Sequence, residues 1–132
     1  MERLREREVL ASGEAAIAAS AADMAEGDSF LRHFWNIRPV PVEGGGAHSR
    51  MLTGAHTANR VGHVQGGISF GIAAACACAA VPATMMLSSV SAWYISPGHG
   101  KALKVKSRIV HAGRSLAVVR TEITTAAGER VL

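Results

Sequence analysis

The chain has 132 residues, of which 48% are hydrophobic and 18% are charged. This length and composition exclude a disordered chain and are typical of one domain with a single core. The formal net charge of +4 allows an anionic partner, either nucleic acid or a phosphorylated small molecule. Two cysteines are too few for a disulfide framework, so we expect a reducing, cytoplasmic location.

The first predicted element is an Ala-rich helix over residues 2–26, with a loose apolar stripe among its charges. Gly27 and Asp28 end this helix. The N-terminus mixes charges of both signs and has no apolar stretch, which excludes a secretory signal. We therefore divide the chain into an N-terminal helical extension, residues 1–28, and one folded domain, residues 29–132.

A strand hairpin is expected next. Residues 30–42 carry aromatic and branched side chains together with Pro39 and Pro41, which favours an edge or irregular strand. Residues 43–46 are typical of a turn, and residues 48–53 return as a short strand. Residues 55–63 then form a polar loop.

The rest of the chain is organised around residues 59–86. A polar turn that ends in Gly66 and Gly67 leads into an Ala-rich segment without charge, which predicts a helix buried on all sides. Pro82 and several small polar residues favour a core helix over a transmembrane span. Cys76 and Cys78 are two residues apart, so they cannot face each other; we expect both to pack in the core and expect no metal site.

The N-terminus of this helix is a candidate binding site. The first N–H groups of a helix have no partner within the helix, and the helix dipole is positive there. Gly66 and Gly67 would let a ligand carbonyl approach the backbone closely. Such a turn suits a developing oxyanion, although two glycines before a helix also occur for steric reasons alone.

Antiparallel strands are expected after the helix. Residues 85–95 are apolar on both parities, which predicts a central, two-sided strand, and residues 96–100 form a turn. Residues 101–111 alternate basic and apolar side chains, residues 115–125 form another strand, and Val131 begins a last one. The order predicts an α+β domain in which an antiparallel sheet wraps around one apolar helix, leaving an edge and a face for a second copy to cover.

Four motifs occur in order along this part of the chain: Asn59-x5-Gln65-Gly66-Gly67 before the apolar helix, Trp93-Tyr-Ile-Ser-Pro97, Val110-His-Ala-Gly-Arg-Ser115, and Ala127-Gly-Glu129. Together they resemble the hot-dog-fold acyl-CoA thioesterases, in the branch of the phenylacetyl-CoA and 4-hydroxybenzoyl-CoA thioesterases. The resemblance covers residues 34–132. It implies a hot-dog fold, a homodimer or homotetramer with the site at the subunit interface, and hydrolysis of an acyl-CoA. It implies no cofactor beyond the coenzyme A of the substrate.

The resemblance also implies roles for single residues. Gly67 would donate its backbone N–H to the thioester oxygen, and Gln65 stands where the family usually has histidine. Asn59 matches a polar residue that supports the site, and we add His63 as a candidate base. Candidate contacts to the substrate are Gly66, Phe70, Cys78, Trp93, Lys101 and Arg114.

One position departs from the family pattern. Ala74 stands seven residues after Gly67, where the family has the Asp or Glu that serves as nucleophile or base. Three interpretations stay open. His63 acts as base through a water, since imidazole takes up a proton near neutral pH; Glu43 or Glu122 of a neighbouring subunit reaches the site; or the domain binds acyl-CoA without cleaving it, as one half of a tandem assembly.

Lys104, Lys106 and Arg108 fall on one face of the predicted strand over residues 101–111. This face suits either solvent or the phosphates of coenzyme A. It lacks the interleaved aromatic side chains on which nucleic-acid bases stack. We therefore expect an acyl-CoA as the small-molecule partner, and neither nucleic acid nor a membrane.

Overall fold

The computed structural model describes residues 30–35 and 37–132, so the predicted helical extension lies outside the described residues. The elements follow one another as a short helix, a hairpin, a second helix and two long strands. Their bounds are α2 Phe30–Trp35, β1 Val40–Val42, β2 Gly46–Leu52, the 3₁₀ turn η1 Ala55–Thr57, α3 Gly66–Ala79, β3 Ala102–Ala112 and β4 Ala117–Thr125.

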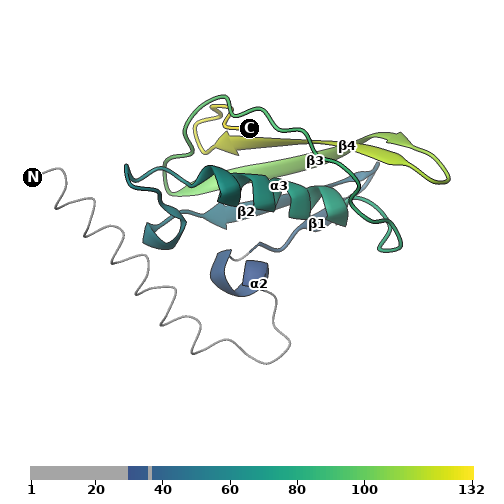
Figure 1. The fold of residues 1–132 in the computed structure, drawn as a ribbon, viewed down its shortest axis with the longest axis horizontal. Coiled ribbons are helices and arrows are strands. Elements are labelled where there is room, and N and C mark those ends of the chain that lie inside the picture. Colours follow the sequence, from purple (N-terminus) through teal and green to yellow (C-terminus); the bar gives the residue numbers. More distant parts are fainter. Residues whose placement is uncertain (1–29, 36) are drawn as a thin grey trace, which may run out of the picture.

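The four strands form one antiparallel sheet in the order β1-β2-β3-β4. Helix α3 lies along one face of this sheet and contacts β2, β3 and β4, as Figure 1 shows. One sheet with one helix along it confirms the predicted α+β arrangement.

The core lies between α3 and the inner face of the sheet. Strand residues alternate between this face and solvent, so that Ala47, Met51, Leu103, Val105 and Ile123 are buried. Ile72 and Cys76 of α3 pack against them. The alternation predicted for residues 101–111 is therefore confirmed.

The β1–β2 hairpin confirms one part of the prediction and corrects another. Gly44 and Gly45 turn the chain with φ of 88° and 91°, a region that glycine enters without a steric cost. Pro41 lies in β1 at the edge of the sheet, where no neighbour needs its missing N–H. The expected strand does not begin at residue 30, because residues 30–35 contain neither Gly nor Pro and form α2.

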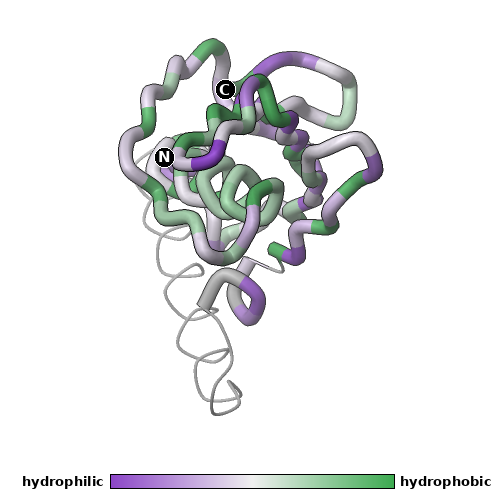
Figure 2. The backbone as a smooth tube through the Cα atoms, turned by 90° about the vertical axis from the view of Figure 1, so that its right-hand side faces the viewer, coloured by the Kyte–Doolittle hydropathy of each residue, from purple (hydrophilic) through white to green (hydrophobic). Residues whose placement is uncertain are grey.

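Helix α3 is shorter and more exposed than predicted. It ends at Ala79, ahead of Pro82, whose ring disfavours helical geometry in the preceding residue. The sheet covers one side of the helix, and Gly67, Phe70 and Cys78 are exposed. The prediction of a helix buried on all sides is therefore wrong for the single chain, although α3 contains no charged residue and is coloured mainly as hydrophobic in Figure 2.

Residues 85–95 do not form the predicted central strand. Among the described residues, the backbone N–H groups of Ile95 and Ser96 donate to Val131 O, at 2.9 and 3.4 Å, and no ladder continues toward Met85. A central strand needs a partner on each side, and in one chain this segment has neither along most of its length. Its apolar side chains are exposed, with Met86 at 91% and Trp93 at 73%.

Candidate active site

A cavity of about 340 Å³ opens at the N-terminus of α3. The loop before the helix, the first turn of the helix and residues 94–98 surround it. The polar side chains in its wall are those of Asn59, His63, Ser69, Tyr94 and Ser96. The structure thus brings together Asn59, His63 and Gly66, three of the residues predicted from the sequence.

Asn59 shapes the loop that carries His63. Its Oδ1 accepts the backbone N–H of Val61 at 3.1 Å and that of His63 at 3.0 Å. Its own N–H donates to His63 O at 2.6 Å, and Gly62 between them has φ of 82°. These bonds close a tight turn, because Asn tolerates and stabilises such local geometry. Asn59 therefore acts on the site by fixing the position of His63.

The first turn of α3 leaves backbone donors open. Gln65 donates its N–H to Thr57 O at 2.9 Å and accepts the N–H of Ser69 at 3.0 Å, which anchors the start of the helix. The Gln65 side chain makes no capping bond. The N–H groups of Gly66, Gly67 and Ile68 precede the first intrahelical donor, so the helix offers them and its positive dipole end to a ligand.

Gly67 stands in open space. A Cβ built at this position meets no atom within 4 Å, whereas one at Gly66 lies 3.3 Å from the Tyr94 ring. The two glycines therefore serve different ends. Gly66 makes room for Tyr94, and Gly67 keeps the approach to the helix N-terminus free.

Tyr94 is a residue of this site that the sequence analysis did not select. Its hydroxyl donates to Gly66 O at 3.0 Å, and its ring lies against Gly66 in the wall of the cavity. It belongs to the Trp93–Pro97 motif, from which Trp93 was chosen instead. Trp93 is largely exposed and does not line this cavity. Tyr94 therefore ties residues 94–98 to the first turn of α3.

Tyr94→Phe tests this tie. The phenylalanine ring keeps the contact with Gly66 and loses the hydrogen bond, which is worth no more than about 1 kcal/mol at an exposed site. We expect a loss of stability of that size or less, and a three- to tenfold drop in any turnover at this site. Thermal unfolding and a rate assay on the same preparation check both values. An unchanged rate would show that the hydroxyl does not position the helix turn.

A second cavity of about 430 Å³ lies beside the first, between the loop of residues 53–64 and the turn of residues 98–101. The two cavities share Val64 and Gly98, whose backbones are bonded, Val64 N to Gly98 O at 2.9 Å. Lys101 and His99 line this second cavity and provide its basic groups. The cavity lined by the predicted contact Lys101 therefore adjoins the cavity at the helix N-terminus.

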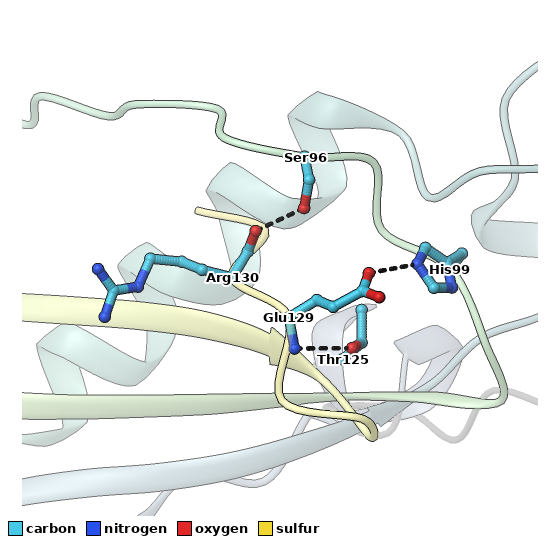
Figure 3. A network of polar contacts seen from close by, with 5 residues as sticks. All are labelled: Ser96, His99, Thr125, Glu129 and Arg130. Atoms are coloured by element: carbon cyan, nitrogen blue, oxygen red, sulfur yellow. Dashed lines mark hydrogen bonds and ion pairs between the residues drawn. The ribbon is translucent and has the colours of Figure 1, made fainter.

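A network of polar contacts connects the turn that lines these cavities to the end of β4 and the residues that follow it (Figure 3). His99 Nε2 lies 2.9 Å from a carboxylate oxygen of Glu129. The Ser96 hydroxyl donates to Arg130 O, and the N–H of Glu129 donates to Thr125 Oγ1 at 3.2 Å. The turn of residues 96–100 is thus tied to the chain that follows β4.

The other predicted site residues lie apart from these cavities. Phe70 and Cys78 are exposed on α3, and Gln65 and Gly67 flank the first cavity without lining it. Arg114 lies in the β3–β4 turn, at the far end of a strand of 11 residues from Lys101 (Figure 1). One chain therefore does not place Arg114 near Gly67.

No carboxylate of the described residues lines either cavity. Ala74 is half-buried in α3, and Glu43 is exposed in the β1–β2 turn. Glu122 lies 3.6 Å from Arg120 and 3.5 Å from Arg130, and Glu129 lies beside His99. Glu122 and Glu129 are thus engaged elsewhere, and His63 is the histidine in the wall of the first cavity.

The two cysteines differ in environment. Both are free, but Cys76 is buried and Cys78 is exposed, so the expectation that both pack in the core is wrong for Cys78. Burial raises the pKa of the Cys76 thiol, and a hydrogen bond with Ser107 opposes this only in part. The Cys76 thiol also donates to Ala47 O at 3.5 Å.

These environments predict unequal thiol reactivity. Because the pKa of Cys76 is raised above the ordinary value of 9.0, its thiol stays protonated at pH values below 9.0. The thiolate is the form that reacts with a disulfide reagent. At pH 8 we expect a disulfide reagent to label Cys78 at least tenfold faster than Cys76 when the subunits are separated, because Cys78 is exposed in the single chain. Cys78→Ala should remove the fast phase and Cys76→Ala should leave it. Equal rates in the native protein would contradict the burial of Cys76.

Several solved structures share this fold, and some of them are described as thioesterases. One is the BH2602 protein from Bacillus halodurans with CoA, which matches with a TM-score of 0.68 at 24% identity over 95% of this chain and 85% of that one. Thioesterase HI1161 from Haemophilus influenzae matches with a TM-score of 0.71 at 17% identity over 80% and 77% of the two chains. The E. coli PaaI protein from the phenylacetic acid degradation operon matches with a TM-score of 0.65 at 17% identity over 98% and 91%.

These similarities establish the class of fold, which is the hot-dog fold. None of the curated protein sequences matches the chain. Residues 55–132 match the family model of the acyl-CoA thioesterase N-terminal domain. The chain therefore belongs to the acyl-CoA thioesterase N-terminal domain family, as its motifs predicted.

Proposed function

We propose that this domain hydrolyses an acyl-CoA thioester at the N-terminus of α3. The observation that carries the proposal is the set of open N–H donors at Gly66, Gly67 and Ile68 beside a cavity that contains His63. Preorganised donors of this kind stabilise the oxyanion that forms when a thioester is attacked. Membership of the acyl-CoA thioesterase family supports this chemistry.

In this proposal the thioester oxygen accepts the N–H of Gly67, and His63 removes a proton from the attacking water. The loop built around Asn59 holds His63 in the wall of the cavity. The hydroxide adds to the carbonyl carbon, and the tetrahedral intermediate collapses with release of the coenzyme A thiolate, which takes up a proton. No cofactor takes part, and the coenzyme A belongs to the substrate.

The second cavity suits the phosphates of coenzyme A. Lys101 and His99 line it, and the BH2602 protein of the same fold was solved with CoA. The His99 side chain lies 2.9 Å from the Glu129 carboxylate, so Lys101 is the main cation there. We propose that the nucleotide end of the substrate lies at Lys101 and the thioester at Gly67.

A second copy of the chain would complete the site. Helix α3 is uncharged yet exposes Phe70 and Cys78, and Trp93 stands in the open. Exposed apolar surface of this extent is typical of an interface. We propose a cytoplasmic homodimer or homotetramer in which Phe70, Cys78 and Trp93 line the acyl site between subunits, and Arg114 is contributed from the neighbouring subunit.

The alternative is a domain that binds acyl-CoA without cleaving it. Ala74 and the lack of a carboxylate in either described cavity favour this alternative. The family is described as an N-terminal domain, which is consistent with one half of a tandem assembly. A ligand that binds only the folded state raises thermal stability whether or not it is cleaved, so stabilisation and turnover separate the two functions.

Release of free thiol from short, long and aromatic acyl-CoAs tests the proposal. Hydrolysis predicts turnover of at least one class of acyl-CoA, lowered in Gln65→Ala and lowered further in His63→Ala. Stabilisation by acyl-CoA with no thiol release from any substrate would favour the binding domain. If acyl-CoA neither stabilised the protein nor was cleaved, both proposed functions would be overturned.

A further inference from the structure

The outer face of the sheet, opposite α3, carries a concentration of positive charge. We name it the basic face; its basic residues are His48 and Arg50 of β2, Lys104, Lys106 and Arg108 of β3, and Arg120 of β4. All six are exposed. They form one patch because the register of the strands sets them side by side.

The register brings like charges directly opposite each other. Arg50 is paired with Lys104, and Arg108 is paired with Arg120. Like charges across a strand pair destabilise a sheet. Glu122 is the carboxylate on this face within the described strands, and it is already shared by Arg120 and Arg130. The fold therefore carries a repulsion that an anionic partner would relieve.

Aliphatic side chains border the cations on the same face. Val40 lies opposite His48 and shares its side of the sheet, and Leu52 and Val118 fall on that side by alternation. Val40, Leu52 and Val118 are 50%, 51% and 46% exposed. A partner for this face must accept both positive charge and small aliphatic groups.

These features distinguish between kinds of partner. Neither cavity is lined by a cation of the basic face, so a small ligand has no concave site there. Strands β1 to β4 contain no Phe, Trp or Tyr, so this face lacks the large aromatic side chains usual both in base stacking and as anchors at protein interfaces. A second copy would bring the same charge. An anionic lipid surface accepts cations at its phosphates and aliphatic side chains beside them.

We propose that the basic face binds the surface of a membrane rich in anionic phospholipid. This contact is peripheral, since no described helix is long and apolar enough to cross a bilayer. It departs from the sequence-based expectation, which was that the protein has no membrane partner. It is independent of the proposed hydrolysis, because α3 and both cavities lie away from this face.

Flotation of the full chain with vesicles tests the proposal. Vesicles of 30% phosphatidylglycerol in phosphatidylcholine should bind the protein, and pure phosphatidylcholine should not. Binding should fall steeply between 50 and 300 mM NaCl, because salt screens such contacts. Absence of binding to the anionic vesicles at 50 mM NaCl would overturn the proposal.

Matched variants separate the face from net charge. Lys104→Gln with Lys106→Gln should weaken vesicle binding at least tenfold and leave the fold intact, since both side chains are exposed. Arg32→Gln with Arg60→Gln removes the same charge from exposed positions outside the face and should change binding less than twofold. Equal losses in the two pairs would mean that only net charge acts and would overturn the proposal.

A third variant separates lipid from nucleic acid. Leu52→Asn keeps every cation and should weaken vesicle binding about threefold, because it removes an aliphatic contact. It should change any binding to duplex DNA much less, because such binding depends mainly on contacts between phosphates and cations. Duplex binding tighter than vesicle binding at the same salt would overturn the membrane proposal in favour of a nucleic-acid surface.

Discussion

Gly67→Ala should lower thioester turnover about 100-fold without harming the fold, a loss similar to that of one oxyanion donor. A methyl group at Gly67 would enter the open space in front of the helix N-terminus, where the thioester is proposed to lie. The same change should leave stability unchanged or raise it by about 0.5 kcal/mol, because alanine favours a helix over glycine. Thiol release and thermal unfolding on one preparation measure both.

Gly71→Ala is the matched control. Gly71 lies one turn further along α3, where a Cβ would be 3.7 Å from the Trp35 ring, an ordinary contact. This variant also replaces a glycine of α3 by alanine, but it leaves the helix N-terminus unchanged. Turnover should therefore change less than twofold. Equal losses of turnover in Gly67→Ala and Gly71→Ala would mean that alanine disturbs the helix as a whole. Wild-type turnover in both variants would mean that the thioester binds elsewhere.

His63→Ala should lower turnover at least 100-fold while acyl-CoA still binds. Loss of a general base typically costs two to four orders of magnitude in rate. The loop should survive, because Asn59 holds residue 63 through its backbone N–H and not through the imidazole. Turnover and the thermal shift caused by acyl-CoA measure the two effects separately.

His56→Ala controls for the loss of a histidine from the same loop. His56 lies in η1, half-buried, and lines neither cavity. Its replacement should leave turnover within twofold of the wild-type value. Full activity in His63→Ala would exclude the imidazole as base and would return attention to a carboxylate from a neighbouring subunit.

The fold could be predicted from the sequence where the sequence pattern corresponds to contacts within this chain. The alternation along β3 has one buried face and one exposed face, and both are present in the structure. The Gly44–Gly45 turn is equally local, since positive φ requires glycine there.

Predictions failed for two segments whose apolar composition indicates more burial than the described chain provides. The apolar residues of α3 and of residues 85–95 predicted complete burial, yet Phe70 and Trp93 are exposed. Amino-acid composition indicates that a side chain favours burial, but it does not indicate which surface buries it. Residues 85–95 have strand-like composition without a ladder for the same reason.

The candidate site was predicted in part. The spacing from Asn59 to Gly67 indicated the helix N-terminus, and the cavity there contains Asn59 and His63. Tyr94 was missed because its contact with Gly66 O joins residues 28 positions apart, and no local pattern records that distance. Arg114 was chosen for its turn, whose place at the far end of the sheet depends on the length of β3.

The carbonyl stretch of a bound thioester tests the central claim most directly. His63→Ala should hold an acyl-CoA labelled with ¹³C at its carbonyl long enough for infrared difference spectra. Hydrogen bonds from the first turn of α3 predict a lower stretching frequency than in water, lost when Gly67→Ala is added and kept when Gly71→Ala is added. A bound carbonyl with the same frequency in all three proteins would contradict polarisation by the helix N-terminus.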